Sequence, residues 1–217
     1  MKVIAVIPSL KERTADVAIS LVRKQISDVI VLENLERAES IATAWDISKE
    51  YDYLVWTPTD LLIKRGVIDG LLQELIKSKT DRIVGRCMSK FRGMTVGGVT
   101  IQKTHKNEQL IKHLRANPNS LRPESGTALQ LLTHVKSNID AGFHEYFLDY
   151  DEIYARYQHH RKKHERQVLR MVQEWRIKAK TDKDFRAAMH GVLGLPQDME
   201  SKGVLSLAEV KQIIKMV

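Results

Sequence analysis

Apolar runs alternate with amphipathic stretches along the first part of the chain. Continuous apolar or β-branched runs stand at residues 3–7, 29–32 and 53–56. Such runs are typical of strands that are covered on both faces, and Pro8 is expected to end the first one because proline has no N–H for a sheet ladder. After each run, apolar residues recur at helical spacing, within 17–26, 37–50 and 67–76. Three successive strand–helix units predict an α/β fold, a parallel sheet with right-handed crossovers.

The later pattern adds shorter elements and then one long helix. Shorter elements are predicted at 83–88 (strand), 93–101 (strand or hairpin), 107–115 (helix) and 127–132 (an apolar run). Gly142 is expected to end the segment that follows the last of these. Residues 151–180 have the period of one long helix, which the glycines and proline between 191 and 196 would break. A last helix is predicted over 206–216, with Ser206 as the N-cap of a capping box.

Composition and cysteine content narrow the class of protein. Of the 217 residues 43% are hydrophobic and 29% are charged, which is typical of a soluble globular protein. No apolar run approaches the roughly 20 residues that cross a bilayer, and the first residues lack the pattern of a signal peptide. Cys87 is the only cysteine, which excludes an internal disulfide and a cysteine-based zinc cluster. We therefore expect a cytoplasmic protein.

The positive charge is concentrated late in the chain. Residues 156–186 contain eleven Lys and Arg against four acids, a surplus of seven out of the net charge of +8. The same segment has an apolar stripe at helical spacing, made of Val168, Val172, Trp175 and Ala179. Three interpretations follow: a nucleic-acid-binding helix, a basic amphipathic helix that docks peripherally on an anionic membrane, or a helix with one solvated cationic face.

The strand ends locate a candidate ligand site. In an open α/β sheet, ligands bind outside the carboxyl ends of the strands, at a switch in strand order. These ends are predicted at Pro8-Ser9, at Glu33-Asn34 and at 57–60. The turn over residues 7–11 has no glycine, so it is neither a phosphate-binding loop nor a dinucleotide fingerprint. This argues against NAD enzymes and ATPases.

Asp60, an acidic stretch and a pair of histidines allow two interpretations each. Asp60 could hold a divalent cation or cap the following helix. The acids at 149, 151 and 152 could supply a general base or an acidic helix N-terminus. His160 and His164 lie four residues apart, a spacing that suits a shared metal ion or a solvated basic face.

Several short motifs occur in an order that resembles the GT-A glycosyltransferases, particularly those of the family 2 type. They are Val6-Ile7-Pro8-Ser9, Leu32-Glu33-Asn34, the stretch 51–60 (YDYLVWTPTD), Gly126-Thr127-Ala128-Leu129, 142–147 (GFHEYF) and the acidic-aromatic stretch 149–156. The resemblance covers residues 1–158. It implies a GT-A, Rossmann-like fold with a mostly parallel sheet flanked by helices, and leaves 159–217 as a basic helical C-terminal extension.

The resemblance also implies a site for a nucleotide-diphosphate sugar of the UDP or GDP type. Pro8, Ser9 and Glu33 would hold the nucleoside. Asp60 would be the last acid of a DxD motif, which binds Mn²⁺ or Mg²⁺ at the diphosphate. Pro58 occupies the place of the first acid in that motif.

The later motifs imply roles on the acceptor side of such a site. Asp151, or Asp149 in a neighbouring register, would be the general base that deprotonates an acceptor hydroxyl. Glu145 and Arg156 would lie near the acceptor. His164 would join the metal in a retaining relative. The function expected from the sequence is therefore a metal-assisted glycosyltransferase, with nucleic-acid binding through 156–186 as the alternative.

Overall fold

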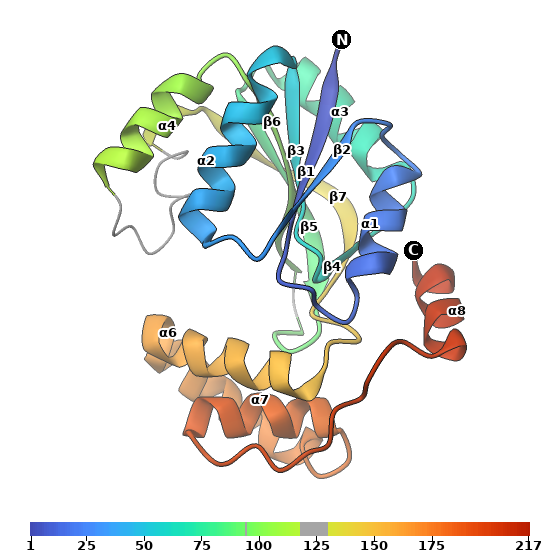
Figure 1. Ribbon diagram of the computed structural model, residues 1–217. Coiled ribbons are helices and arrows are strands. Elements are labelled where there is room, and N and C mark those ends of the chain that lie inside the picture. Colours follow the sequence, from blue (N-terminus) through green and yellow to red (C-terminus); the bar gives the residue numbers. More distant parts are fainter. Residues whose placement is uncertain (94, 118–129) are drawn as a thin grey trace.

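The computed structural model describes residues 1–93, 95–117 and 130–217, apart from the side chains of Thr95, Lys163 and His164. Within these residues, seven strands form one sheet in the order β2-β1-β3-β6-β5-β7-β4 (Figure 1). Their bounds are Val3–Ser9 (β1), Val29–Glu33 (β2), Tyr53–Trp56 (β3), Leu61–Ile63 (β4), Arg82–Ser89 (β5), Thr95–Lys103 (β6) and His134–His144 (β7).

Most strands of the sheet run in one direction. β1 is parallel to β2 and β3, and β3 and β5 are both antiparallel to the strand between them, β6. β7 is parallel to β5, while β4 pairs with β7 in the antiparallel sense. Five strands therefore end at the same side of the sheet, here called the carboxyl edge, with last residues Ser9, Glu33, Trp56, Ser89 and His144. The predicted α/β class with a mostly parallel sheet is confirmed.

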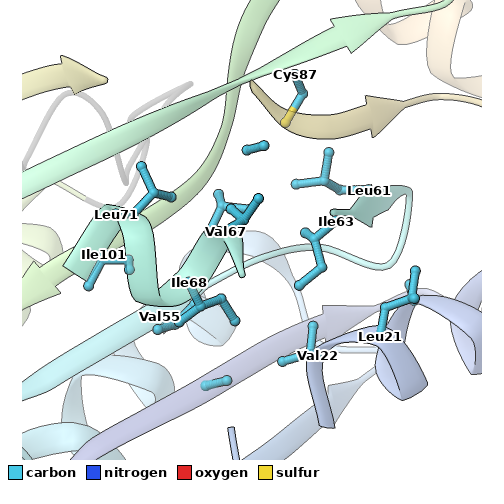
Figure 2. Close-up of a cluster of buried hydrophobic side chains, with 14 of the residues drawn as sticks. Leu21, Val22, Val55, Leu61, Ile63, Val67, Ile68, Leu71, Cys87 and Ile101 are labelled. Carbon is cyan, nitrogen blue, oxygen red and sulfur yellow. The ribbon is translucent and has the colours of Figure 1, made fainter. Parts of the chain in front are cut away.

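Helices cover both faces of the sheet (Figure 1). α1 (Ala15–Arg23), α3 (Val67–Ser78) and α8 (Leu207–Met216) supply side chains to one buried cluster, part of which Figure 2 shows. α2 (Arg37–Ile47) and α4 (Asn107–Ala116) contribute to a second cluster, and the short helix η1 (Ser48–Glu50) follows α2. Each apolar side chain buried in this way contributes roughly 1.5–3 kcal/mol relative to exposure, so the two clusters hold the three layers together.

A helical hairpin lies beyond the carboxyl edge. It consists of α6 (Tyr150–Lys178) and α7 (Lys183–Leu193) (Figure 1). In a straight helix Tyr157 and Trp175, 18 positions apart, would be separated by about 27 Å along the axis, yet the two ring centroids are 5.0 Å apart. The axis of α6 therefore turns back on itself. The Trp175 indole N–H donates to the carbonyl of Phe91 at 2.9 Å, which ties the hairpin to the end of β5.

The structure corrects several sequence-based expectations. Pro8 lies inside β1, where its carbonyl accepts from the Thr59 N–H at 3.4 Å, so it does not end the strand. Gly142 likewise lies inside β7, and a Cβ there would be 2.0 Å from the Leu62 carbonyl oxygen. Glycine thus lets the unpredicted strand β4 pair with β7. Gly191, which was expected to break the helical pattern, lies inside α7 (Lys183–Leu193), whereas Gly194 caps the end of this helix. Residues 118–119 of the predicted loop at 117–119 and residues 127–129 of the predicted run at 127–132 lie outside the described residues.

Two larger features bear on the predicted organisation. The expected boundary at 158/159 falls inside α6, and α8 returns to the sheet, where Ile213 joins the first buried cluster. Among the helices of the described residues, none is both long and apolar enough to cross a membrane.

Candidate functional site

The loops that follow β1, β2 and β3 meet at the carboxyl edge. The Asn34 N–H donates to the Ser9 carbonyl at 2.9 Å, and the Thr14 hydroxyl donates to the Thr59 carbonyl at 2.8 Å. Ser9 is buried and accepts from the Lys11 N–H at 3.0 Å, whereas Glu33 is exposed and pairs with the Lys11 ammonium at 3.4 Å. The chain runs from β1 to β2 on one side and then to β3 on the other. The switch in strand order expected of a ligand site therefore lies beside Ser9.

A cluster of buried charges lies at the same edge. Its charged members are Asp60, His144, Glu145 and Arg156, and they are here called the charge cluster. Asp60 comes just before β4, His144 is the last residue of β7 with Glu145 directly after it, and Arg156 comes from the second turn of α6. The sheet and the hairpin thus each supply part of one site.

Ion pairs connect all four members of the charge cluster. The Arg156 Nη1 donates to Asp60 Oδ2 and lies 3.8 Å from Glu145 Oε1. His144 stands between the two carboxylates, with Nε2 at 3.3 Å from Asp60 Oδ2 and Nδ1 at 3.4 Å from Glu145 Oε2. Two cations face two anions, so the charges are balanced within the cluster.

Neutral hydroxyl groups complete the surroundings of Glu145. The Ser89 hydroxyl donates to Oε2 at 2.7 Å, and the Tyr157 hydroxyl donates to Oε1 at 3.3 Å. Glu145 also has a φ of +67°, in the left-handed region that non-glycine residues rarely adopt. Such backbone strain of order 1–3 kcal/mol persists where the surroundings fix the conformation, and it is frequent at functional sites.

Burial and charge pairing set the protonation states of the cluster. Burial alone would lower the pKa of His144, but attraction to Asp60 outweighs it and raises that pKa to about 9. Burial would raise the pKa of Glu145, but the bond and charge of His144, together with Arg156 and Ser89, lower it to about 2. The pKa of Asp60 is lowered against the effect of its burial, chiefly by Arg156 and His144. At neutral pH the cluster therefore holds two carboxylates, an imidazolium and a guanidinium.

Part of the charge cluster is open to a ligand. The side chains of Arg156 and His144 are each 22% exposed, whereas those of Asp60 and Glu145 are almost fully buried behind them. Among the described residues, Arg156 bonds only through Nη1, which leaves its Nε and Nη2 N–H groups for another partner. Oδ1 of Asp60 is buried and has no hydrogen-bond partner there either. An anion that approached from the open side would meet the two cations first.

The divalent cation expected from the sequence does not fit these side chains. A Mg²⁺ or Mn²⁺ site is built from several oxygen ligands that carry excess negative charge. Here Asp60 is already paired with a guanidinium and an imidazolium, and Pro58 replaces the other acid. No three His, Cys, Asp or Glu side chains within the described ranges are arranged to hold a metal. The side chain of His164, the other predicted ligand, lies outside the described residues.

The two predicted base candidates lie at the start of α6. Asp149 is the N-cap, and its Oδ2 accepts from the Ser201 hydroxyl at 2.7 Å and from the Lys202 N–H at 2.9 Å. Against the effect of burial, these bonds lower the pKa of Asp149. Asp151 is exposed and accepts from Gln197 at 3.0 Å. The capping role that the sequence left open for this acidic stretch is thus realised by Asp149.

Glu152 is the acid of this stretch that contacts the loop after β1. It accepts from the N–H of Asp149, which completes the capping box, and from the Arg13 N–H, each at 2.7 Å. Burial, together with the nearby acids, raises its pKa. The loop after β1 and the start of α6 are therefore fixed to each other.

The segment that joins α7 to α8 runs past the loop that follows β1. Arg13 donates to both carboxylate oxygens of Glu209, at 2.9 and 2.8 Å, and to the carbonyls of Gly203 and Phe147. The bonds from Arg13 lower the pKa of Glu209 to about 2. The segment that joins α7 to α8 is thus fastened beside the loop that follows β1.

The basic segment presents mainly charged side chains to solvent, together with Leu169 and Ile177. The apolar stripe identified in the sequence is buried in the hairpin, at Val168, Val172, Trp175 and Ala179. Six exposed cations form what is here called the basic surface: Lys162, Arg166, Arg170, Arg176, Lys180 and Lys183. Within the described residues none of the six forms an ion pair. The apolar stripe expected to face a membrane is used in packing instead.

The sequence had given Asp60, Glu145 and Arg156 separate roles, and the structure brings them together. It adds three residues that the sequence reasoning missed, namely His144, Ser89 and Tyr157. His144 lies within the GFHEYF stretch, so its place beside Glu145 was a usable signal. Ser89 and Tyr157 carry no such local signal, because they join the site through contacts distant in sequence.

Comparisons with known proteins give partial likenesses at low identity. No family model matches the chain. No curated protein matches it either. Among solved structures, the A197 protein from STIV is 13% identical with a TM-score of 0.47, over 67% of this chain and 83% of that one.

Two further structures are similar over a comparable part of the chain. The bifunctional IspDF from Campylobacter jejuni is 12% identical with a TM-score of 0.41, over 63% of this chain and 49% of its own. A glycosyltransferase involved in glycosylation of the major capsid of PBCV-1 is 13% identical with a TM-score of 0.41, over 62% of this chain and 81% of that one. We therefore argue function from the side chains at the carboxyl edge.

Proposed function

We propose that this protein is a glycosyltransferase that moves a sugar from a nucleoside-diphosphate donor to an acceptor hydroxyl. The observation that carries the proposal is the charge cluster. Its two cations, Arg156 and His144, are partly exposed at the carboxyl edge of a sheet that helices cover on both faces. Thr59 contacts Pro8 and directly precedes Asp60, so the loop after β1 and the charge cluster are linked by one residue. A nucleoside near Ser9 could thus place its diphosphate toward Arg156.

The nucleoside side of this proposal rests on the first two strand ends. Pro8 and Ser9 would line the nucleoside pocket, and the exposed Glu33 carboxylate would accept an N–H or O–H from the base or the ribose. Lys11, whose ammonium group pairs with Glu33, has a backbone φ of +62° in a turn without glycine. This arrangement favours recognition by side chains over a glycine-lined phosphate loop.

The acceptor side requires a base and a balanced bond exchange. A carboxylate takes the proton of the acceptor hydroxyl, the oxygen attacks the anomeric carbon, and the bond from that carbon to the diphosphate breaks. The electron pair leaves with the nucleoside diphosphate, whose charge the cations of the cluster stabilise. Asp151 is the exposed candidate for the base, and Asp149 is the alternative that is engaged as a helix cap.

Calorimetric titration with UDP and GDP, in Mn²⁺ and separately in EDTA, tests this proposal. We expect at least one of the two nucleotides to bind in at least one condition. UMP and GMP serve as matched controls that lack the second phosphate, and they should bind at least tenfold more weakly. Absence of UDP and GDP binding in both conditions would rule out the proposed function.

A second candidate function, nucleic-acid binding, is favoured by the basic surface. Its cations are exposed, and Lys162, Arg166 and Arg170 recur every fourth residue of α6. The apolar stripe of the same segment is buried, and exposed cations attract phosphates. We expect weak, sequence-independent and strongly salt-dependent binding.

Anisotropy titrations with a labelled single-stranded RNA at several salt concentrations test the second candidate. The charge reversal Lys162→Glu/Arg166→Glu/Arg170→Glu should abolish binding. A matched reversal away from the basic surface, Arg23→Glu/Lys24→Glu/Lys77→Glu, should retain more of it. Equal loss in both variants, or binding to anionic vesicles but not to RNA, would contradict a nucleic-acid site.

A further inference from the structure

The charge cluster leaves the proposed glycosyltransferase without the divalent cation that its sequence motif suggests. Resting on the proposed function, we propose that Arg156 holds the donor diphosphate at this site in place of a metal ion. Two observations carry this inference: the carboxylate that would bind the metal is already bonded to Arg156, and no partner in the described part of the chain occupies the Nε–Nη2 edge of Arg156.

The first observation concerns the charge around Asp60. This side chain is 5% exposed and is the one acid left of the expected motif, since Pro58 stands in the other position. Arg156 and His144 both contact its Oδ2. A divalent cation there would add two positive charges beside a guanidinium that has no means of losing its own. The like-charge repulsion disfavours the metal at the distance where it would have to bind.

The second observation concerns the donors of Arg156. Asp60 and Glu145 both contact Nη1, from the buried side of the guanidinium. Among the described residues no partner binds Nε or Nη2, and the side chain is 22% exposed. The Nε–Nη2 edge of arginine is a planar fork that matches two phosphate oxygens. The two carboxylates therefore fix the Nη1 side of the guanidinium, and among the described residues its Nε–Nη2 edge has no partner.

Asp60 acts at this site through Arg156. Its Oδ2 accepts from the guanidinium Nη1, and its Oδ1 is buried without a hydrogen-bond partner within the described ranges. Because neither oxygen of this carboxylate faces solvent, Asp60 is a positioning residue for Arg156 and not a ligand of the substrate.

The chemistry needs no proton transfer at Arg156. As the bond between the anomeric carbon and the diphosphate oxygen breaks, negative charge grows on that diphosphate, and a permanently charged fork stabilises it. The guanidinium remains protonated before and after the step, and the electron pair stays on the departing phosphate oxygen. Arg156 therefore replaces the electrostatic part of what a metal ion would supply.

Titration of the whole protein with UDP and GDP tests the inference. We expect the dissociation constant in EDTA to be within about threefold of that in Mn²⁺. Arg156→Gln should weaken binding by at least tenfold, as expected for loss of a charge-assisted bond, and Arg156→Lys should lie between. The matched control Arg170→Gln removes the same charge from an exposed position of the same helix and should bind normally.

A double variant guards against a folding defect, because Arg156→Gln alone leaves Asp60 without a charged partner. In Asp60→Asn/Arg156→Gln both charges are removed together, and a cooperative thermal transition would show that this protein is folded. We expect the folded double variant to lose the nucleotide as well. Normal binding by the folded double variant would overturn the role of Arg156.

The variant Pro58→Asp/Arg156→Gln sharpens the distinction between the two kinds of site. It restores the second acid and removes the competing cation, so its nucleotide binding should become dependent on Mn²⁺. If the unmodified protein binds UDP or GDP only with Mn²⁺, the proposed function stands and the inference about Arg156 is wrong. If no condition gives binding, both are wrong.

Discussion

Two groups of cations lie in and around α6, and they differ in burial and in ion pairing. In the charge cluster, Arg156 and His144 lie against buried carboxylates that fix their positions. On the basic surface, six Lys and Arg side chains stand in solvent, without an ion pair in the described part of the chain. Buried pairs have a defined geometry and can select one anion, whereas exposed charges act through their summed, salt-screened field. The same change of charge should therefore have different consequences in the two regions.

The largest contrast is expected from removal of Arg156. Arg156→Met leaves Asp60 and Glu145 as buried charges with one cation fewer, which should lower the free energy of unfolding by about 3–5 kcal/mol. Urea denaturation followed by circular dichroism measures this loss. A change below about 1 kcal/mol would mean that the pair contributes little to the fold.

The contribution of His144 to the stability of the fold should depend on pH. Its pKa in the folded protein is about 9, above the ordinary value of 6.5, so its stabilising effect is complete below pH 6.5. That effect is lost as the pH rises through 9, and it amounts to about 3 kcal/mol at most. Urea midpoints between pH 6 and 10 should fall in the unmodified protein and fall less in His144→Gln. Parallel pH profiles for the two proteins would refute the assignment.

Arg13 is a nearly buried cation beside the same site, and it pairs with the carboxylate of Glu209. Arg13→Ala removes both of its bonds to Glu209 and should cost about 2 kcal/mol. Hydrogen exchange of the α8 amides measures the loosening, which should exceed that in the sheet. Unchanged exchange of α8 would show that Ile213 alone keeps the helix in place.

The smallest effect on stability is expected on the basic surface. Single changes Lys162→Gln, Arg166→Gln and Arg170→Gln remove exposed charges without ion pairs, so each should change the free energy of unfolding by less than about 0.5 kcal/mol. Thermal and urea unfolding check this. A loss above 1 kcal/mol for any of them would show that the surface supports the hairpin.

Much of the sheet was predictable because its strands are continuous apolar runs followed by amphipathic helices. The same rule fails where an element is short or where glycine has a packing role. β4 has three residues between a proline-containing loop and a helix, too few to show a period. The sequence pattern predicts a helix break at Gly191, yet a Cβ there would lie 2.3 Å from the Tyr154 carbonyl oxygen, so glycine allows α7 to pack on α6.

The site was predictable residue by residue but not as one arrangement. Asp60 and Arg156 are 96 positions apart, and no local pattern shows that they are bonded. The sequence motif placed a metal at Asp60, since it could not reveal that a guanidinium already lies there. His144 could have been noticed in its stretch, but its charge depends on Asp60, which only the fold brings near.

The central claim is that the open edge of Arg156 receives the diphosphate of a nucleotide donor. A crystal structure obtained after soaking with UDP and GDP in the presence of Mn²⁺ tests it most directly. The account predicts a phosphate oxygen within hydrogen-bond distance of Arg156 Nε or Nη2, with no metal bound to Asp60. A nucleotide held at Asp60 through Mn²⁺, with Arg156 displaced from the phosphates, would contradict it.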